Sequence, residues 1–300
     1  MKYLSSLTQN PIILYAMRGR RRNWRTNTAL FLALATYVPC CLVFGLGALS
    51  SLVLASGVQD FLRDLDNAGQ ITFYITAVLL LIFVTLFAPM MALSAIAGEK
   101  QRQTLDLLRV TLLPERKIVG GKLISALLYS LLLIVLAWPV ILFCLITGGV
   151  KIMELIVLVV LLLTTAVAFT SVGLFMSSLS RSTTNAAMLT YGVALPLLLL
   201  GPFLAMLPIS IASSFADSYQ IGELVNFYGW SLAASLNPII SAILSAVWHT
   251  DKGGWLVYNW SIASRHHYLP FPWIIYAVFY SLLTWLLTQL TTRRLERMNE

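Results

Sequence analysis

The chain has 300 residues, of which 59% are hydrophobic and 11% are charged, and its formal net charge is +8. Soluble domains carry about 25% charged side chains. This composition therefore excludes an ordinary soluble protein and predicts an integral membrane protein, for which we expect contact with membrane lipid and no nucleic-acid partner.

Seven stretches of the chain contain no Asp, Glu, Lys, Arg or His, and each is long enough to cross a bilayer, which takes roughly 20 helical residues. They are residues 28–59, 71–98, 123–150, 155–180, 182–216, 224–248 and 268–292. Strands of a membrane barrel span about 9–11 residues and alternate in polarity, whereas these stretches are apolar throughout. The sequence predicts an all-α fold, with the helices bundled into a single transmembrane domain.

Residues 1–26 carry six Lys and Arg side chains ahead of the first apolar stretch. Cytoplasmic segments near membrane spans retain positive charge, and a segment of this kind can lie along anionic lipid headgroups. We interpret 1–26 as a cytoplasmic interfacial segment, with a solvated tail as the alternative.

The distribution of all the basic residues favours an even number of crossings. With both termini in the cytoplasm, sixteen of the 20 Lys and Arg residues lie on the cytoplasmic side. One of the seven apolar stretches must then fail to cross. We predict six spans, at residues 28–55, 71–97, 118–147, 153–179, 185–211 and 270–291.

Residues 98–113, between the second and third predicted spans, combine charged side chains with leucines at helical spacing: Leu105, Leu108 and Leu112. Pro114 ends this pattern, because the residue before a proline is displaced from the helical region. The pattern predicts a short amphipathic helix whose apolar stripe contacts either another protein or the lipid surface.

The fourth predicted span has a face of small residues: Ala166, Thr170, Gly173 and Ser177. Small side chains allow two helices in a membrane to approach closely. We interpret this face as a helix-packing surface within the subunit, with a dimer interface or a pathway lining as alternatives.

The stretch 224–248 is the one that we expect not to cross. It contains Asn237 and Pro238, and a proline removes a main-chain donor that lipid cannot replace. We predict that residues 212–269 form an external region with a re-entrant helical hairpin.

The stretch "GEKQRQTLDLLRVTLLPERKIVGGK" at residues 98–122 resembles the signature of ABC-2 type transporter permeases. In that family the loop after the second span reads roughly E-(R/K)-x-x-G-T-L-(E/D)-x-L-L-x-T-P-L-(S/T)-x-x-x-I-V-x-G-K. The matching residues here are Glu99, Lys100, Thr104, Leu105, Asp106, Leu107, Leu108, Thr111, Ile118, Val119, Gly121 and Lys122. The sequence departs from the pattern at Gln103, where the family usually has Gly, and at Leu112, where it usually has Pro.

This resemblance implies the permease half of an ATP-binding-cassette exporter in a bacterial inner membrane, with a second permease copy as homodimer or heterodimer partner. It also implies that the 98–113 helix couples to a separate ATPase subunit. The residues expected at that contact are Glu99, Lys100, Thr104, Leu105, Leu108 and Leu112, with Gly121 and Lys122 in the loop that follows.

The sequence has no G-x-x-x-x-G-K-[ST] loop, whose main-chain amides cradle phosphates. We therefore expect ATP and Mg²⁺ on the partner ATPase. For this chain we expect no bound cofactor, no metal and no catalytic residue.

Two other classes of protein are weaker alternatives. An ATPase-independent channel or secondary transporter normally holds ionisable groups within the membrane. The seven apolar stretches contain no such group, because they are defined as the stretches without Asp, Glu, Lys, Arg or His. A membrane enzyme would have to use His249, His266 or His267, but adjacent histidines point to different faces and no Cys, Asp or Glu nearby completes a metal set. The substrate stays open.

Overall fold

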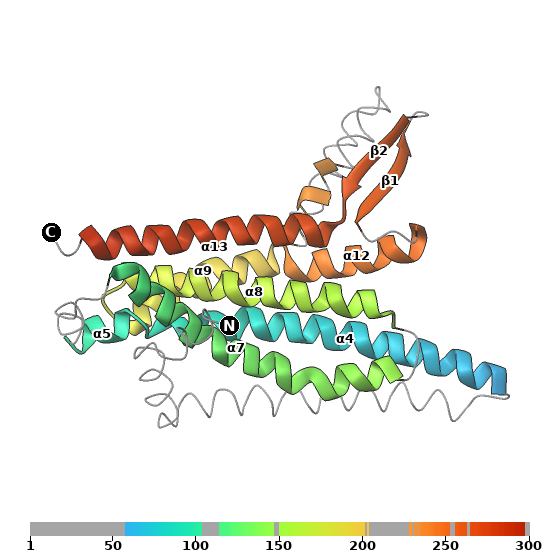
Figure 1. Ribbon diagram of the computed structural model, residues 1–300, viewed down its shortest axis with the longest axis horizontal. Coiled ribbons are helices and arrows are strands. Elements are labelled where there is room, and N and C mark those ends of the chain that lie inside the picture. Colours follow the sequence, from blue (N-terminus) through green and yellow to red (C-terminus); the bar gives the residue numbers. More distant parts are fainter. Residues whose placement is uncertain are drawn as a thin grey trace, which may run out of the picture.

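The computed structural model describes residues 58–103, 114–146, 150–201, 203, 228–229, 231–233, 235–252, 256–262 and 265–297. Long helices dominate this part of the chain and run side by side (Figure 1). In chain order the elements are α4 (Val58–Leu93), α5 (Ala97–Gln101), α7 (Glu115–Ile146), α8 (Ile152–Leu179), α9 (Thr183–Leu199), α12 (Pro238–Lys252), β1 (Val257–Ile262), β2 (Arg265–Pro270) and α13 (Pro272–Arg297).

Four stretches are long and apolar enough to cross a membrane: Gly69–Gln101, Glu115–Ile146, Ile152–Leu179 and Pro272–Arg297. They overlap the expected spans at 71–97, 118–147, 153–179 and 270–291. The expected span at 28–55 and the interfacial segment 1–26 lie outside the described residues. The expected span at 185–211 begins as α9, which has 17 residues, and most of 201–211 lies outside the described part, so the count of six spans stays a prediction.

Helix α8 is the centre of the bundle and packs against α4, α13, α9 and α7. Its sequence explains this position, because apolar and small residues continue around the whole helix, as expected for a helix buried among others. The main core contains Leu80 and Leu81 of α4, Leu161 and Leu162 of α8, and Tyr276 of α13, all at most 1% exposed.

A second core cluster lies where α5 joins the bundle, and we call this the α5 end. It contains Met91, Ile96, Val119, Leu174 and Leu295, which come from four separate stretches of the chain. The end of α13 and the start of α7 therefore lie beside the residues that lead into α5. This arrangement gathers the basic residues of these segments at one end of the bundle: Lys100, Arg102, Arg116, Lys117, Lys122, Arg181, Arg293, Arg294 and Arg297.

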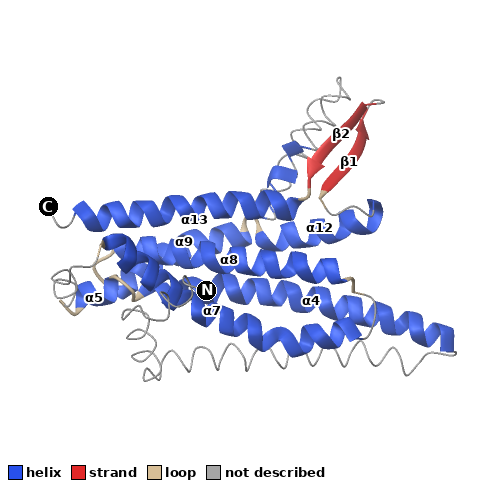
Figure 2. Ribbon diagram, in the orientation of Figure 1, coloured by secondary structure: helices blue, strands red, loops and turns tan. Residues whose placement is uncertain are grey.

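The opposite end carries one feature that the all-helical prediction did not include. Strands β1 and β2 pair antiparallel, from Val257 opposite Pro270 to Ile262 opposite Arg265, and they project from the helices (Figure 2). The strand sequences VYNWSI and RHHYLP are rich in aromatic residues, which favour strands. A two-residue link between the strands is the commonest hairpin connection.

The predicted external region 212–269 is represented by α12 and this hairpin; most of its first part, 212–234, lies outside the described residues. Helix α12 runs antiparallel to α13, because the Trp273 amide donates to Ser245 Oγ at 3.2 Å and the Tyr280 hydroxyl donates to the Leu236 carbonyl at 2.7 Å. Tyr280 is two turns inside α13. Helix α12 therefore starts beside the second turn of α13 and runs toward its start, and the re-entrant hairpin stays a prediction.

Candidate functional site

A turn separates α4 from α5, and a side chain of α8 forms hydrogen bonds to its main chain. Residues Ser94–Ile96 form a turn between α4 and α5. The hydroxyl of Ser177 accepts hydrogen bonds from the amides of Ile96 (3.2 Å) and Ala97 (2.9 Å) and donates to the Leu93 carbonyl (2.7 Å). A serine hydroxyl offers one donor and two acceptor positions, so all of them are used here. We call this turn with Ser177 the α4–α5 junction.

The close approach of α8 to α4 depends on the small residues of α8. A Cβ atom added at Gly173 would lie 2.7 Å from the Pro89 carbonyl oxygen, so α4 or α8 would have to shift to admit it. Ala166, Thr170 and Ser177 are each fully buried, and the Thr170 hydroxyl lies 3.5 Å from the Ala88 carbonyl. The face selected from the sequence therefore lies against α4 within the subunit.

A buried lysine of α7 attaches α5 from another side. The Lys122 ammonium donates to the Ala95 carbonyl at 2.6 Å and forms an ion pair with the Glu99 carboxylate. The side chain of Lys122 is 8% exposed and that of Glu99 is 26% exposed. Charged donors make stronger hydrogen bonds than neutral ones, so Lys122 holds both the turn and the first turn of α5.

Helix α5 has two further attachments. The Lys100 ammonium donates to the Ser178 carbonyl of α8 at 2.6 Å. The Thr183 hydroxyl of α9 donates to Gln101 Oε1 at 3.3 Å. Helix α5 is thus connected to α7, α8 and α9 by side chains.

The predicted helix over 98–113 is not continuous. Helix α5 ends at Gln101, and Gln103 has a φ of 56°, which is the left-handed region. A left-handed residue stops a helix and is usually glycine. Residues 104–113, with the expected contact residues Thr104, Leu105, Leu108 and Leu112, lie outside the described residues.

A sequence profile of the ABC-2 type transporter family matches residues 11–216, more than half of the 300 residues. The chain belongs to the ABC-2 type transporter family. A search of curated proteins found no match. This ABC-2 chain is accordingly a multi-pass membrane protein and a permease subunit of an ABC transporter, a type of subunit that is generally non-catalytic and normally pairs with an ATPase subunit.

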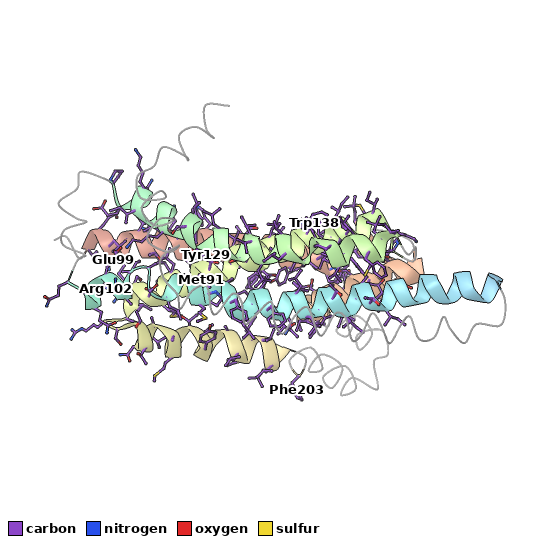
Figure 3. The ribbon with its side chains drawn as sticks, turned by 90° about the horizontal axis from the view of Figure 1, so that it is seen from below. Met91, Glu99, Arg102, Tyr129, Trp138 and Phe203 are labelled. Carbon is purple, nitrogen blue, oxygen red and sulfur yellow. The ribbon has the colours of Figure 1, made fainter. Side chains whose placement is uncertain are left out.

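Several motif residues of this ABC-2 permease meet at the α4–α5 junction. Glu99 and Lys100 lie on α5, and Gly121 and Lys122 lie buried in the first two turns of α7. Figure 3 shows Glu99 and Arg102 at this end, and Trp138 and Phe203 farther along the bundle. Glu99 and Lys122, which are 23 positions apart in the motif, thus form an ion pair.

Pro238 is the first residue of α12, and Asn237 before it also contacts α9. The Asn237 Oδ1 atom accepts from the amides of Ile239 (2.9 Å) and Ile240 (3.3 Å), as a helix N-cap does. Its amide nitrogen donates to the carbonyls of Leu197 (3.1 Å) and Leu198 (3.0 Å). Position 202 is a proline and has no amide to donate back to the residue 198 carbonyl, so Asn237 replaces that donor.

One buried ionisable residue, Glu154 in the first turn of α8, is not among the residues selected from the sequence. It is 8% exposed, and its Oε2 atom has no hydrogen-bond partner within the described part of the chain. The charge-free stretch begins at residue 155, so this carboxylate lies just outside it. Its place at the start of an apolar helix is the signal that the sequence offers.

The histidines considered from the sequence belong to two elements, α12 and β2. His249 is buried, with its Nε2 atom 3.3 Å from the Lys151 ammonium. His266 and His267 are on β2, opposite Ser261 and Trp260. Among the described residues, no group of three or more His, Cys, Asp or Glu side chains is placed to hold a metal ion.

Proposed function

We propose that this permease is the membrane-spanning subunit of an ATP-driven exporter and that its ATPase subunit docks on residues 98–113. The observation that supports the proposal is the attachment of α5, which starts this segment, to three helices of the bundle. Lys122 contacts it from α7, Ser177 from α8 and Thr183 from α9. A displacement of α5 by a partner would therefore act on all three helices.

Energy considerations favour such an attachment. A shift of a two-state equilibrium from 1:99 to 99:1 requires about 5.5 kcal/mol of differential binding. The contact between the ATPase and residues 98–113 is small. It can transmit that energy only if α5 moves together with the helices that it contacts. The buried hydrogen bonds of Ser177 and Lys122 supply this connection.

The distribution of charge supports a cytoplasmic α5 end. Basic side chains from α5, α7, α13 and the link between α8 and α9 gather there, and cytoplasmic loops carry an excess of Lys and Arg. The hairpin β1–β2 then faces outward, in a bacterial inner membrane. Apolar side chains exposed on α7, α9 and α13, such as Leu142, Met188 and Leu282, suit lipid or a second permease copy.

The test is a pull-down from solubilised native membranes. We compare the wild type with a Leu105→Asp/Leu108→Asp variant and identify the proteins that copurify. The control is Leu256→Asp, the same substitution at a residue that is 61% exposed at the opposite end of the bundle. We expect an ATP-binding-cassette ATPase with the wild type and the control but not with the double variant; retention by the double variant would exclude this docking segment.

Glu154 favours a second candidate, an ATPase-independent channel or secondary transporter, because a buried ionisable residue in a membrane helix is typical of ion-coupled carriers. Proteoliposomes with an imposed ion gradient and no ATPase separate the two. Substrate movement under these conditions would favour the carrier; movement only with ATPase and ATP would favour the exporter.

A further inference from the structure

A cavity of about 310 Å³ lies at the end of the bundle opposite α5. It is formed by the first half of α4, the start of α8 and α12. Its apolar lining includes Phe73, Ala77, Leu158 and Leu161. Sites for small molecules in proteins have volumes of roughly 300–1,000 Å³ and mostly apolar walls with a few polar groups, so the cavity has the size and the lining of such a site.

Glu154 also lines this cavity. More than nine-tenths of the residue is buried, and its Oε2 atom has no hydrogen-bond partner among the described residues, although the carboxylate does bond to the main chain of Lys151. A buried charged oxygen without a partner is costly. A cationic ligand in the cavity would remove that cost.

Two further groups interact electrostatically with Glu154, namely Lys151 and His249. The Lys151 Nζ atom lies 3.3 Å from His249 Nε2. Lys151 is exposed, so its charge is solvated. Neither of the two lines the cavity.

Aromatic rings strengthen the preference for a cation. Phe73 and Tyr74 line the cavity on the side of α4, with ring centroids 5.7 Å apart. Gln70 donates to the Tyr74 hydroxyl at 3.3 Å, which fixes the ring. The face of an aromatic ring attracts an ammonium group, so rings and carboxylate favour the same charge.

From this combination we infer that the cavity binds an amphipathic organic cation. Its ammonium group pairs with Glu154, and its hydrocarbon portion lies along Ala77, Leu158 and Leu161. The assignment of such a molecule as the transported substrate class rests on the proposed function, whereas its binding does not.

The experiment uses the full chain in nanodiscs of zwitterionic lipid at neutral pH, with empty nanodiscs as reference. Three probes of the same shape are titrated: phenylhexylamine, phenylhexanol and phenylhexanoate. Binding is followed by ligand-observed saturation-transfer NMR. The variants are Glu154→Gln, the cavity-filling Ala242→Trp, and the control Glu115→Gln, which removes a glutamate from the first turn of α7 at the other end of the bundle.

We expect the wild type and Glu115→Gln to bind the amine about tenfold more tightly than the alcohol, which corresponds to 1.4 kcal/mol. Glu154→Gln should lose this preference, and Ala242→Trp should weaken all three probes. Equal binding of the three probes, or an amine preference that survives in Glu154→Gln, would overturn the inference. A preference for the carboxylate would also overturn it, since Lys151 would then be the recognising charge.

No ATPase takes part in this measurement. A negative result therefore concerns the cavity alone and leaves the docking proposal standing. A pull-down without an ATPase would leave the binding result standing in the same way.

Discussion

Lys122 of α7 and Glu99 of α5 form an ion pair across the α4–α5 junction, and the same ammonium group donates to the Ala95 carbonyl at 2.6 Å. One side chain thus holds both the turn and the helix that follows it. The pair is asymmetric in burial, since Lys122 is 8% exposed and Glu99 is 26% exposed. Desolvation is therefore more complete for the lysine than for the glutamate.

The first prediction rests on the proposed function: Lys122→Met should uncouple the permease from the proposed ATPase partner without preventing membrane insertion. The substitution removes the donor to Ala95 and leaves Glu99 without its cation, at a cost of about 1–3 kcal/mol. We expect a lower unfolding temperature in detergent, and ATP hydrolysis that no longer responds to the permease.

The double variant Lys122→Met/Glu99→Gln tests the effect of the Glu99 charge when Lys122 is absent. It also removes the carboxylate that has lost the Lys122 ammonium, so it should recover part of the stability that the single variant loses. Equal stability of the single and double variants would show that the Glu99 carboxylate costs nothing once Lys122 is gone.

The second prediction concerns Ser177. Ser177→Ala leaves the amides of Ile96 and Ala97 without their acceptor, and a buried unsatisfied group costs about 1–3 kcal/mol. The matched control is Ser178→Ala, because the Ser178 hydroxyl donates only to the Phe175 carbonyl of its own helix, at 2.7 Å. Thermal unfolding should show a clear loss for Ser177→Ala and little change for Ser178→Ala; equal losses would contradict the bridging role.

The sequence predicted the features that are encoded within one helix. Apolar stretches mark the four described spans, and small residues at helical spacing mark the face of α8 that lies against α4. Both patterns are local to one helix, so a single sequence is sufficient to find them.

The turn at Ser94–Ile96 was not predictable in the same way. It contains no glycine or proline, and the predicted span ran through it to residue 97. The turn exists because Ser177, 80 residues farther along the chain, binds the freed amides. The environment of Glu154 is equally non-local, since three separate helices form the cavity beside it.

The third prediction concerns Gln103, whose φ of 56° places it in the left-handed region after α5. A residue with a Cβ atom costs roughly 1–2 kcal/mol there, and glycine avoids most of this cost. Gln103→Gly should therefore stabilise the end of α5 by about 1 kcal/mol and slow amide hydrogen exchange at residues 97–103 about fivefold.

Gln103→Ala is the control, because alanine keeps the Cβ atom. It should show exchange no slower than the wild type. Similar protection in the Gly and Ala variants would mean that the left-handed conformation is not what limits the stability of α5.

The fourth prediction separates the two roles of Asn237. Asparagine and aspartate are equally good N-caps, and both can accept from the Ile239 amide. Only asparagine can donate to the carbonyls of Leu197 and Leu198. Asn237→Asp should therefore cost about 2 kcal/mol or more, because it removes two buried donors and places a carboxylate against carbonyl oxygens.

Ser182→Asp at the start of α9 is the matched control. The Ser182 hydroxyl also caps a helix, accepting from the Asn185 amide at 3.3 Å, and aspartate can accept the same bond, so we expect a change within about 0.5 kcal/mol. If thermal unfolding shows Asn237→Asp to be as mild as Ser182→Asp, Asn237 acts as a cap alone. A large difference would show that one side-chain amide joins α12 to the end of α9, where position 202 provides no amide of its own.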